Sequence, residues 1–137
     1  MKQAFGPHLT LDLNQCNQKK LKDLDFVSQL LNELPDLIGM TKITQPYVFR
    51  YSGLVPEDKG ITGFIVIAES HISIHTFEAK DYVFIDLFSC KHFDYEFAKQ
   101  YLIKAFESKN PKTHLIMRGE NFPRYGGAVH TTADAYV

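Results

Sequence analysis

Cysteine is scarce in this sequence, and net charge of either sign is nearly absent. The two cysteines, Cys16 and Cys90, form no paired spacing such as Cys-x-x-Cys. The pattern therefore does not indicate a disulfide-rich secreted fold, and a reduced, cytoplasmic protein is the default expectation. The 15 basic and 16 acidic residues give a formal net charge of −1 and form no basic stripe, so we expect no nucleic-acid partner.

Long apolar segments are also missing. Residues 1–8 lack the apolar core of a signal peptide, and no apolar run approaches the length of a transmembrane helix, so we expect no membrane partner. The 137 residues are nevertheless 45% hydrophobic, which is enough for the core of one compact domain. We expect a single domain over residues 1–125 and a flexible C-terminal tail over residues 126–137.

The apolar pattern predicts the order β-α-β-β-β-β-α-β. Strands are expected at residues 8–13, 41–51, 61–69, 71–76, 82–90 and 113–117. Helices are expected at about 19–34, ended by Pro35, and after the N-cap residue Asp94 to about Ser108. Short links favour antiparallel pairing, and two helices can cover one face of a sheet. The predicted fold class is α/β (α+β), a two-layer sandwich with a mostly antiparallel sheet and two helices on one face.

Two strands carry more apolar surface than one helical layer can cover. Residues 61–69 are nearly all apolar, which is typical of a strand covered on both faces. The strand at residues 82–90 is apolar on both sides, with Val83, Ile85 and Leu87 on one and Tyr82, Phe84 and Phe88 on the other. A partner subunit would cover the second side, so we expect a homodimer.

Ser70 follows Glu69 at the end of a predicted strand. If the backbone is bent, the Ser70 hydroxyl can attack the carbonyl carbon of Glu69 and convert the peptide bond into an ester. Elimination and hydrolysis then leave a pyruvoyl group, an electron sink that forms a Schiff base with a substrate amine. The alternative is an ordinary serine at a strand end.

His75 is the candidate proton acceptor for this processing, because imidazole titrates near neutral pH. In an extended strand His71 and His75 share one face and Ser70 lies on the other, so the backbone must turn near Ser70 for His75 to reach it. The alternatives are a hydrogen-bonded strand histidine and a zinc site shared with His71. No third ligand stands at a suitable spacing, so we expect no metal.

Cys90 ends the strand at residues 82–90. Its thiol can return a proton to the substrate carbon after carbon dioxide leaves. The alternative is a small buried hydrophobic residue, which is what we expect of Cys16. Asp86 shares a face with Cys90 and is expected to orient a polar group or to accept from a backbone donor.

These residues resemble the pyruvoyl-dependent S-adenosylmethionine decarboxylase family of bacteria and archaea. The family pattern Glu-Ser-His-[Ile/Leu]-Ser-Ile-His-Thr, then a short loop and Asp-[Ile/Val/Leu]-Phe-[Ser/Thr]-Cys, matches residues 69–76 and 86–90. Weaker similarity includes residues 61–63 and 8–16 and extends to about Arg118. The resemblance implies an α/β sandwich that is usually dimeric.

The resemblance also implies a role for each matched residue. Ser70 becomes the pyruvoyl cofactor after cleavage of the bond that follows Glu69. His75 assists processing, together with the hydroxyl of Thr62, where the family has serine. Cys90 is the catalytic acid. The implied activity is decarboxylation of S-adenosylmethionine, a small amino-acid substrate, for spermidine and other polyamines.

One position departs from the family pattern. Ala79 stands where the family has a glutamate associated with the substrate ribose, and the adjacent Glu78 is our candidate substitute. Phe49, Tyr51 and Phe5 are candidates for stacking on adenine. Two other functions stay open: the same pyruvoyl chemistry on arginine or ornithine, and a non-catalytic regulatory relative. The specific motif disfavours an unrelated binding sandwich.

Overall fold

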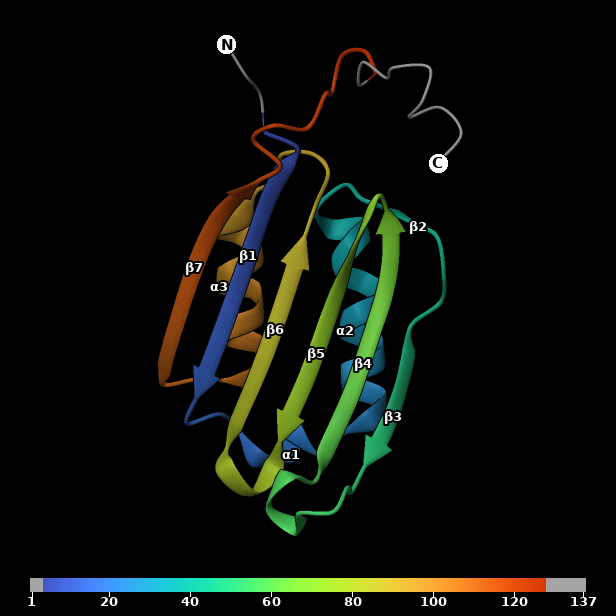
Figure 1. Cartoon of the computed structure of the whole chain (residues 1–137). Coiled ribbons are helices and arrows are strands. Elements are labelled where there is room, and N and C mark those ends of the chain that lie inside the picture. The colour runs from blue at the N-terminus through green and yellow to red at the C-terminus, as the bar shows by residue number, and fades with distance from the viewer. Residues whose placement is uncertain (1–3, 128–137) are drawn as a thin grey trace.

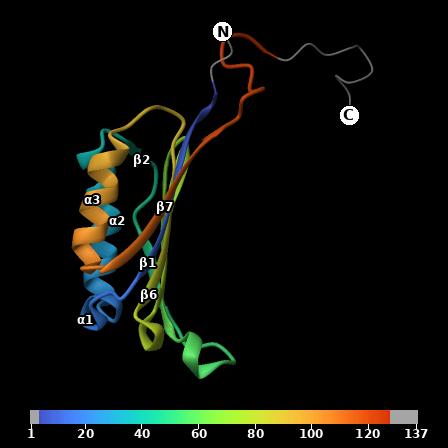
Figure 2. The same ribbon diagram turned by 90° about the vertical axis from the view of Figure 1, so that its left-hand side faces the viewer.

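The computed structural model describes residues 4–127, which form one sheet layer and one helical layer (Figure 1, Figure 2). The strands are β1 Gly6–Asn14, β2 Thr41–Lys42, β3 Tyr47–Tyr51, β4 Gly60–Ala68, β5 Ser70–Phe77, β6 Tyr82–Phe88 and β7 Asn110–Arg118. The helices are α1 Gln18–Leu21, α2 Leu24–Leu37 and α3 Tyr95–Phe106, with 3-10 turns η1 Pro56–Asp58 and η2 Glu78–Lys80. The predicted two-layer sandwich is confirmed.

Every pair of neighbouring strands runs antiparallel, in the order β2-β4-β5-β6-β1-β7. β3 also pairs antiparallel with β4, next to β2 on the same edge. β1 therefore lies between β6 and β7, and the chain continues from β7 past the start of β1 (Figure 1).

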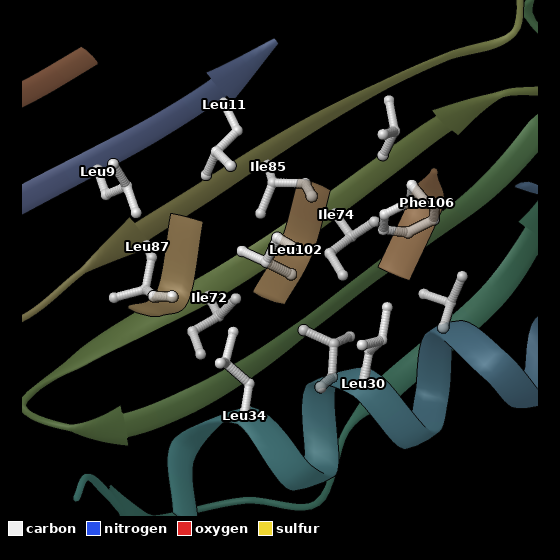
Figure 3. Close-up of a cluster of buried hydrophobic side chains, with 14 of the residues drawn as sticks. Leu9, Leu11, Leu30, Leu34, Ile72, Ile74, Ile85, Leu87, Leu102 and Phe106 are labelled. Carbon is white, nitrogen blue, oxygen red and sulfur yellow. The ribbon is translucent and has the colours of Figure 1, made fainter. Parts of the chain in front are cut away.

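The core lies between the sheet and the two longer helices (Figure 3). α2 buries Val27, Leu30, Leu31 and Leu34, the spacing of one helical face. α3 buries Ala98, Leu102 and Phe106, and its N-cap Asp94 accepts from the Phe97 backbone N–H at 2.9 Å as predicted. Phe97, on the same helix, is 43% exposed, and its ring stacks on that of Tyr101.

Several predicted boundaries were wrong, and three of these differences have a clear physical reason. The helix at residues 19–34 is two helices, because the Asp23 side chain accepts from the Phe26 backbone N–H and starts α2. α2 continues past Pro35 to Leu37, and the backbone N–H of Ile38 still donates to Leu34 at 3.1 Å. The strand at residues 41–51 is divided into β2 and β3 at a segment containing Pro46, which has no N–H for a strand ladder.

One face of the sheet carries no helix (Figure 2). We call it the open face, and it includes the partly exposed side chains of Tyr47, Phe49, Tyr51, Phe64 and Phe84. The expectation that β4 is covered on both faces is therefore wrong for the single chain, since Phe64 is 40% exposed. Val83, Ile85 and Leu87 are buried beneath the helices as predicted.

Two further expectations concern the limits of the chain. Most of the predicted tail, residues 128–137, lies outside the described residues. Within residues 4–127, none of the helices combines the length and the apolarity needed to cross a bilayer.

Candidate active site

Ser70 is the first residue of β5, directly after the tightest turn of the sheet. Ile67 pairs with Ser70, so Ala68 and Glu69 alone form the hairpin loop. Ser70 Oγ is buried, and within the described part of the chain it has no hydrogen-bond partner. A buried hydroxyl without a partner is costly in an ordinary core. The arrangement suits a hydroxyl that is consumed in a reaction on its own backbone.

Cys90 lies against this hairpin loop. The backbone N–H of Glu69 donates to Cys90 Sγ at 3.1 Å, and the thiol lies 3.5 Å from the Ala68 carbonyl oxygen. The strand register explains the contact: His71 pairs with Phe88 between β5 and β6, so Cys90, two residues further, falls opposite Glu69. The thiol therefore contacts the peptide unit between Ala68 and Glu69, which directly precedes the bond between Glu69 and Ser70.

Thr62 and His75 form a second polar group on the open face. They are cross-strand partners, and Thr62 Oγ1 lies 3.4 Å from His75 Nδ1. Phe49 pairs with Thr62 on one side, and Phe84 pairs with His75 on the other. Thr62 and His75 border a hollow of about 250 Å³ that is also lined by Tyr51, Asp58 and Phe77.

The two groups lie at opposite ends of the sheet. Ser70 and His75 both belong to β5, and five residues of extended strand at about 3.3 Å each separate them by roughly 16 Å. The chain does turn next to Ser70 as predicted, but the turn precedes Ser70 and leaves β5 straight. His75 therefore cannot reach Ser70 of its own chain.

The residues proposed for substrate binding are divided in the same way. Glu78 lies near the His75 end, where its Oε1 is 3.4 Å from Lys59 Nζ and its side chain is only 11% exposed. Phe49 and Tyr51 are about half exposed on β3 at that end. Phe5 lies at the Cys90 end, where its ring is 5.6 Å from that of Phe88.

The remaining candidates have structural partners. Asp86 Oδ1 lies 3.2 Å from His8 Nε2, so it orients a polar side chain as expected. Within residues 4–127, no three His, Cys, Asp or Glu side chains gather as a metal site would require. Cys16 is buried with its Sγ donating to the Leu13 carbonyl at 3.3 Å, and burial raises the pKa of its thiol to about 11.

Comparisons with known proteins agree with the motif. The sequence profile of the S-adenosylmethionine decarboxylase family matches residues 7–119. The chain belongs to this family. It is 37% identical over 117 residues to the S-adenosylmethionine decarboxylase proenzyme of Thermodesulfovibrio yellowstonii, covering 85% of this chain and 82% of that protein. The proenzyme of Clostridium botulinum is 31% identical over 116 residues, covering 84% of this chain and 95% of that protein.

A solved structure supports the family fold. The adenosylmethionine decarboxylase of Aquifex aeolicus superposes with a TM-score of 0.73 at 24% identity, covering 85% of this chain and 92% of that chain. At this identity the likeness supports the two-layer fold. The predicted family and fold class are confirmed by these comparisons together.

Sequence reasoning missed two contacts at the decarboxylase-family motif. The first is the pairing of Cys90 with Glu69, which the short link between the predicted strands at residues 71–76 and 82–90 would have indicated through its register. The second is the contact of Arg124 with the Cys90 carbonyl oxygen at 2.7 Å. No local pattern around Arg124 signals this contact, because the two residues meet only in the folded chain.

The two cysteines should differ in reactivity. With a pKa of about 11, only about one Cys16 thiol in a thousand is ionised at pH 8, and the residue is buried. We expect iodoacetamide at pH 8 to modify the partly exposed Cys90 and to leave Cys16 unmodified in the native protein, as measured by peptide mass. Denatured protein, in which both thiols react, is the control. Equal labelling in the native state would contradict this difference.

Proposed function

We propose that this chain is a proenzyme that cuts itself between Glu69 and Ser70, converts Ser70 to a pyruvoyl group and decarboxylates S-adenosylmethionine. Family membership supports the substrate. The observation that carries the cleavage is the hairpin end, where the buried Ser70 hydroxyl has no partner among the described residues and the Cys90 thiol contacts the Glu69 amide at 3.1 Å.

The hairpin end fits a residue that becomes the cofactor. Ser70 Oγ forms no described bond that conversion would break, and the scissile bond lies next to a two-residue loop. A pyruvoyl group supplies the electron sink for loss of carbon dioxide from an amino acid. Cys90 lies close enough to this position to deliver a proton to the substrate carbon.

The proton acceptor for processing comes from a second chain in this proposal. His75 lies roughly 16 Å along β5 from Ser70, so it cannot serve its own chain. Two copies packed through their open faces about a two-fold axis perpendicular to the strands would place opposite sheet ends together. The partner subunit's His75 and the partner subunit's Thr62 would then lie over the open side of the hairpin that ends at Ser70 and contacts Cys90. The homodimer thus completes the site.

The same dimer would assemble the substrate pocket. Phe5 lies at the Cys90 end, while Phe49, Tyr51 and Glu78 lie at the His75 end. A nucleoside between the two ends would meet aromatic side chains for adenine and one carboxylate for the ribose. Glu78 must leave Lys59 to take that role. We also assign the enzyme to the cytoplasm and to polyamine synthesis, in keeping with its two free thiols and its family.

Self-cleavage is the direct test of the proposed cofactor. Intact mass should show fragments 1–69 and 70–137, the second blocked to Edman sequencing. Ser70→Ala should stay one chain and should not decarboxylate, because it lacks the attacking hydroxyl. Ser73→Ala, a serine on the same strand outside the hairpin, is the matched control and should still cleave. A fully active protein that remains uncut would contradict the proposal.

A mixed dimer tests whether the site is shared. His75→Ala alone and Ser70→Ala alone should each stay uncut. When the two chains are co-expressed with different tags, the His75→Ala chain should be cut, because its Ser70 meets His75 of the Ser70→Ala partner. The double variant Ser70→Ala/His75→Ala should not support this cleavage. If the mixed dimer stays uncut while the wild type cleaves, the site lies within one chain.

The substrate is tested by competition between amino acids. We expect carbon dioxide release to favour S-adenosylmethionine over arginine and ornithine in kcat/KM. Glu78→Gln should raise KM for S-adenosylmethionine and leave self-cleavage unchanged, since Glu78 is assigned to the substrate ribose and has no part in the attack of Ser70 on the Glu69 carbonyl. Because Ala79 replaces the glutamate that the family associates with the substrate ribose, a basic amino acid such as arginine or ornithine is the alternative substrate. A preference for arginine or ornithine of more than about tenfold would favour that alternative.

A further inference from the structure

Arg124 joins the C-terminal segment to the backbone of Cys90. One of its nitrogens, Nη2, donates to the carbonyl oxygens of Cys90 at 2.7 Å, Ala4 at 3.4 Å and Phe5. Arg124 lies beyond residues 7–119, the span that matches the family profile. We propose that Arg124 is a positioning residue that holds the Cys90 thiol against the Glu69–Ser70 hairpin. This inference rests on the proposed role of Cys90 as the proton donor.

The chain after β7 passes the start of β1 (Figure 1), and in this segment Arg124 contacts the Cys90 backbone. Gly119 has φ +74°, a conformation that favours glycine, and a side chain there would overlap Phe5. The Phe5 backbone N–H donates to the Gly119 carbonyl at 3.0 Å, and the Phe122 ring packs edge-on against Phe5 at 4.8 Å. The segment 119–124 therefore closes around the N-terminal arm before it reaches Cys90.

Cys90 needs a support of this kind because it lies beyond the strand ladder. β6 ends at Phe88, and the backbone N–H of the next residue, Ser89, still donates to the Pro7 carbonyl of β1 at 3.0 Å. Beyond it, Arg124 holds the carbonyl of Cys90, while the thiol itself contacts the hairpin. A proton donor displaced by about 1 Å loses much of its effect, so the support bears on catalysis.

An arginine side chain suits this positioning role better than a lysine side chain would. A guanidinium carries several N–H donors in a fixed plane, whereas the lysine ammonium is a compact charge on a flexible stem. The Arg124 guanidinium carbon also lies 5.6 Å from the centre of the Phe5 ring. It borders a hollow of about 80 Å³ shared with Phe5 and Cys90. One residue thus fixes both the proposed acid and a candidate adenine-stacking ring.

The test compares Arg124→Gln with a matched control in the full chain. Arg50→Gln removes another arginine that donates to a backbone carbonyl, that of Lys22 at 2.8 Å. For Arg124→Gln we expect self-cleavage to continue, kcat to fall about tenfold or more and KM to change less than about threefold. We also expect Cys90 to be alkylated by iodoacetamide at least about threefold faster, because the thiol leaves the hairpin. Arg50→Gln should match the wild type in all of these.

Arg124→Lys tests whether the planar hydrogen-bond donors of arginine are needed or a positive charge alone is enough. It should give intermediate kcat and alkylation rates, and it replaces the glutamine variant if that one does not fold. Wild-type kcat and alkylation in the Arg124 variants would overturn the inference. So would a loss of kcat that follows a lowered melting temperature while Cys90 alkylation stays unchanged. If the wild type neither cleaves nor decarboxylates, the proposed function fails, and the alkylation rates still decide whether Arg124 holds Cys90.

Discussion

The antiparallel register of β4, β5 and β6 is the constraint on which the candidate site depends. Ile67 pairs with Ser70, which leaves a two-residue loop, and His71 pairs with Phe88, which brings Cys90 opposite Glu69. A shift of one residue in either pairing would reverse the faces of the side chains and separate the thiol from the hairpin. The buried row on the helix side, Ile72, Ile74, Ile85 and Leu87, opposes such a shift, because it would expose these side chains to water.

The one-sided covering of the sheet has a consequence for function. Helices bury one face, and the aromatic and polar residues of the motif that face the other way stay partly exposed. In a single chain this divides the motif into a Ser70–Cys90 group and a Thr62–His75 group, roughly 16 Å apart along β5. In our proposal the same exposed surface drives dimer formation and reunites the two groups. Stability of the dimer and assembly of the site would then be one event.

The segment after β7 adds a second level of control in our inference. The sheet ends with β7 at Arg118 and the family profile ends at residue 119, yet the chain returns to the start of β1 and contacts Cys90. Such a contact adds little to the main core, whose buried residues lie between the helices and the sheet. It acts instead on one short loop. The matched part of the chain would thus supply the chemistry, and the segment that follows it would tune the geometry.

The sequence alone determined the family, the layer architecture and the residue types of the motif. Strand alternation in residues 82–90 identified the face that meets the helices, because Val83, Ile85 and Leu87 repeat every second residue. Asp94 marked the start of α3 because a carboxylate cap is a local interaction. Local signals misplaced the ends of α2 and joined β2 to β3, since pairing with β4 and helix packing decide those boundaries. Only the tertiary structure decided which motif residues meet: register places Cys90 on Glu69, strand length keeps His75 from Ser70, and Arg124 reaches Cys90 across the fold. These distances depend on how distant segments pair, and no window of sequence contains them.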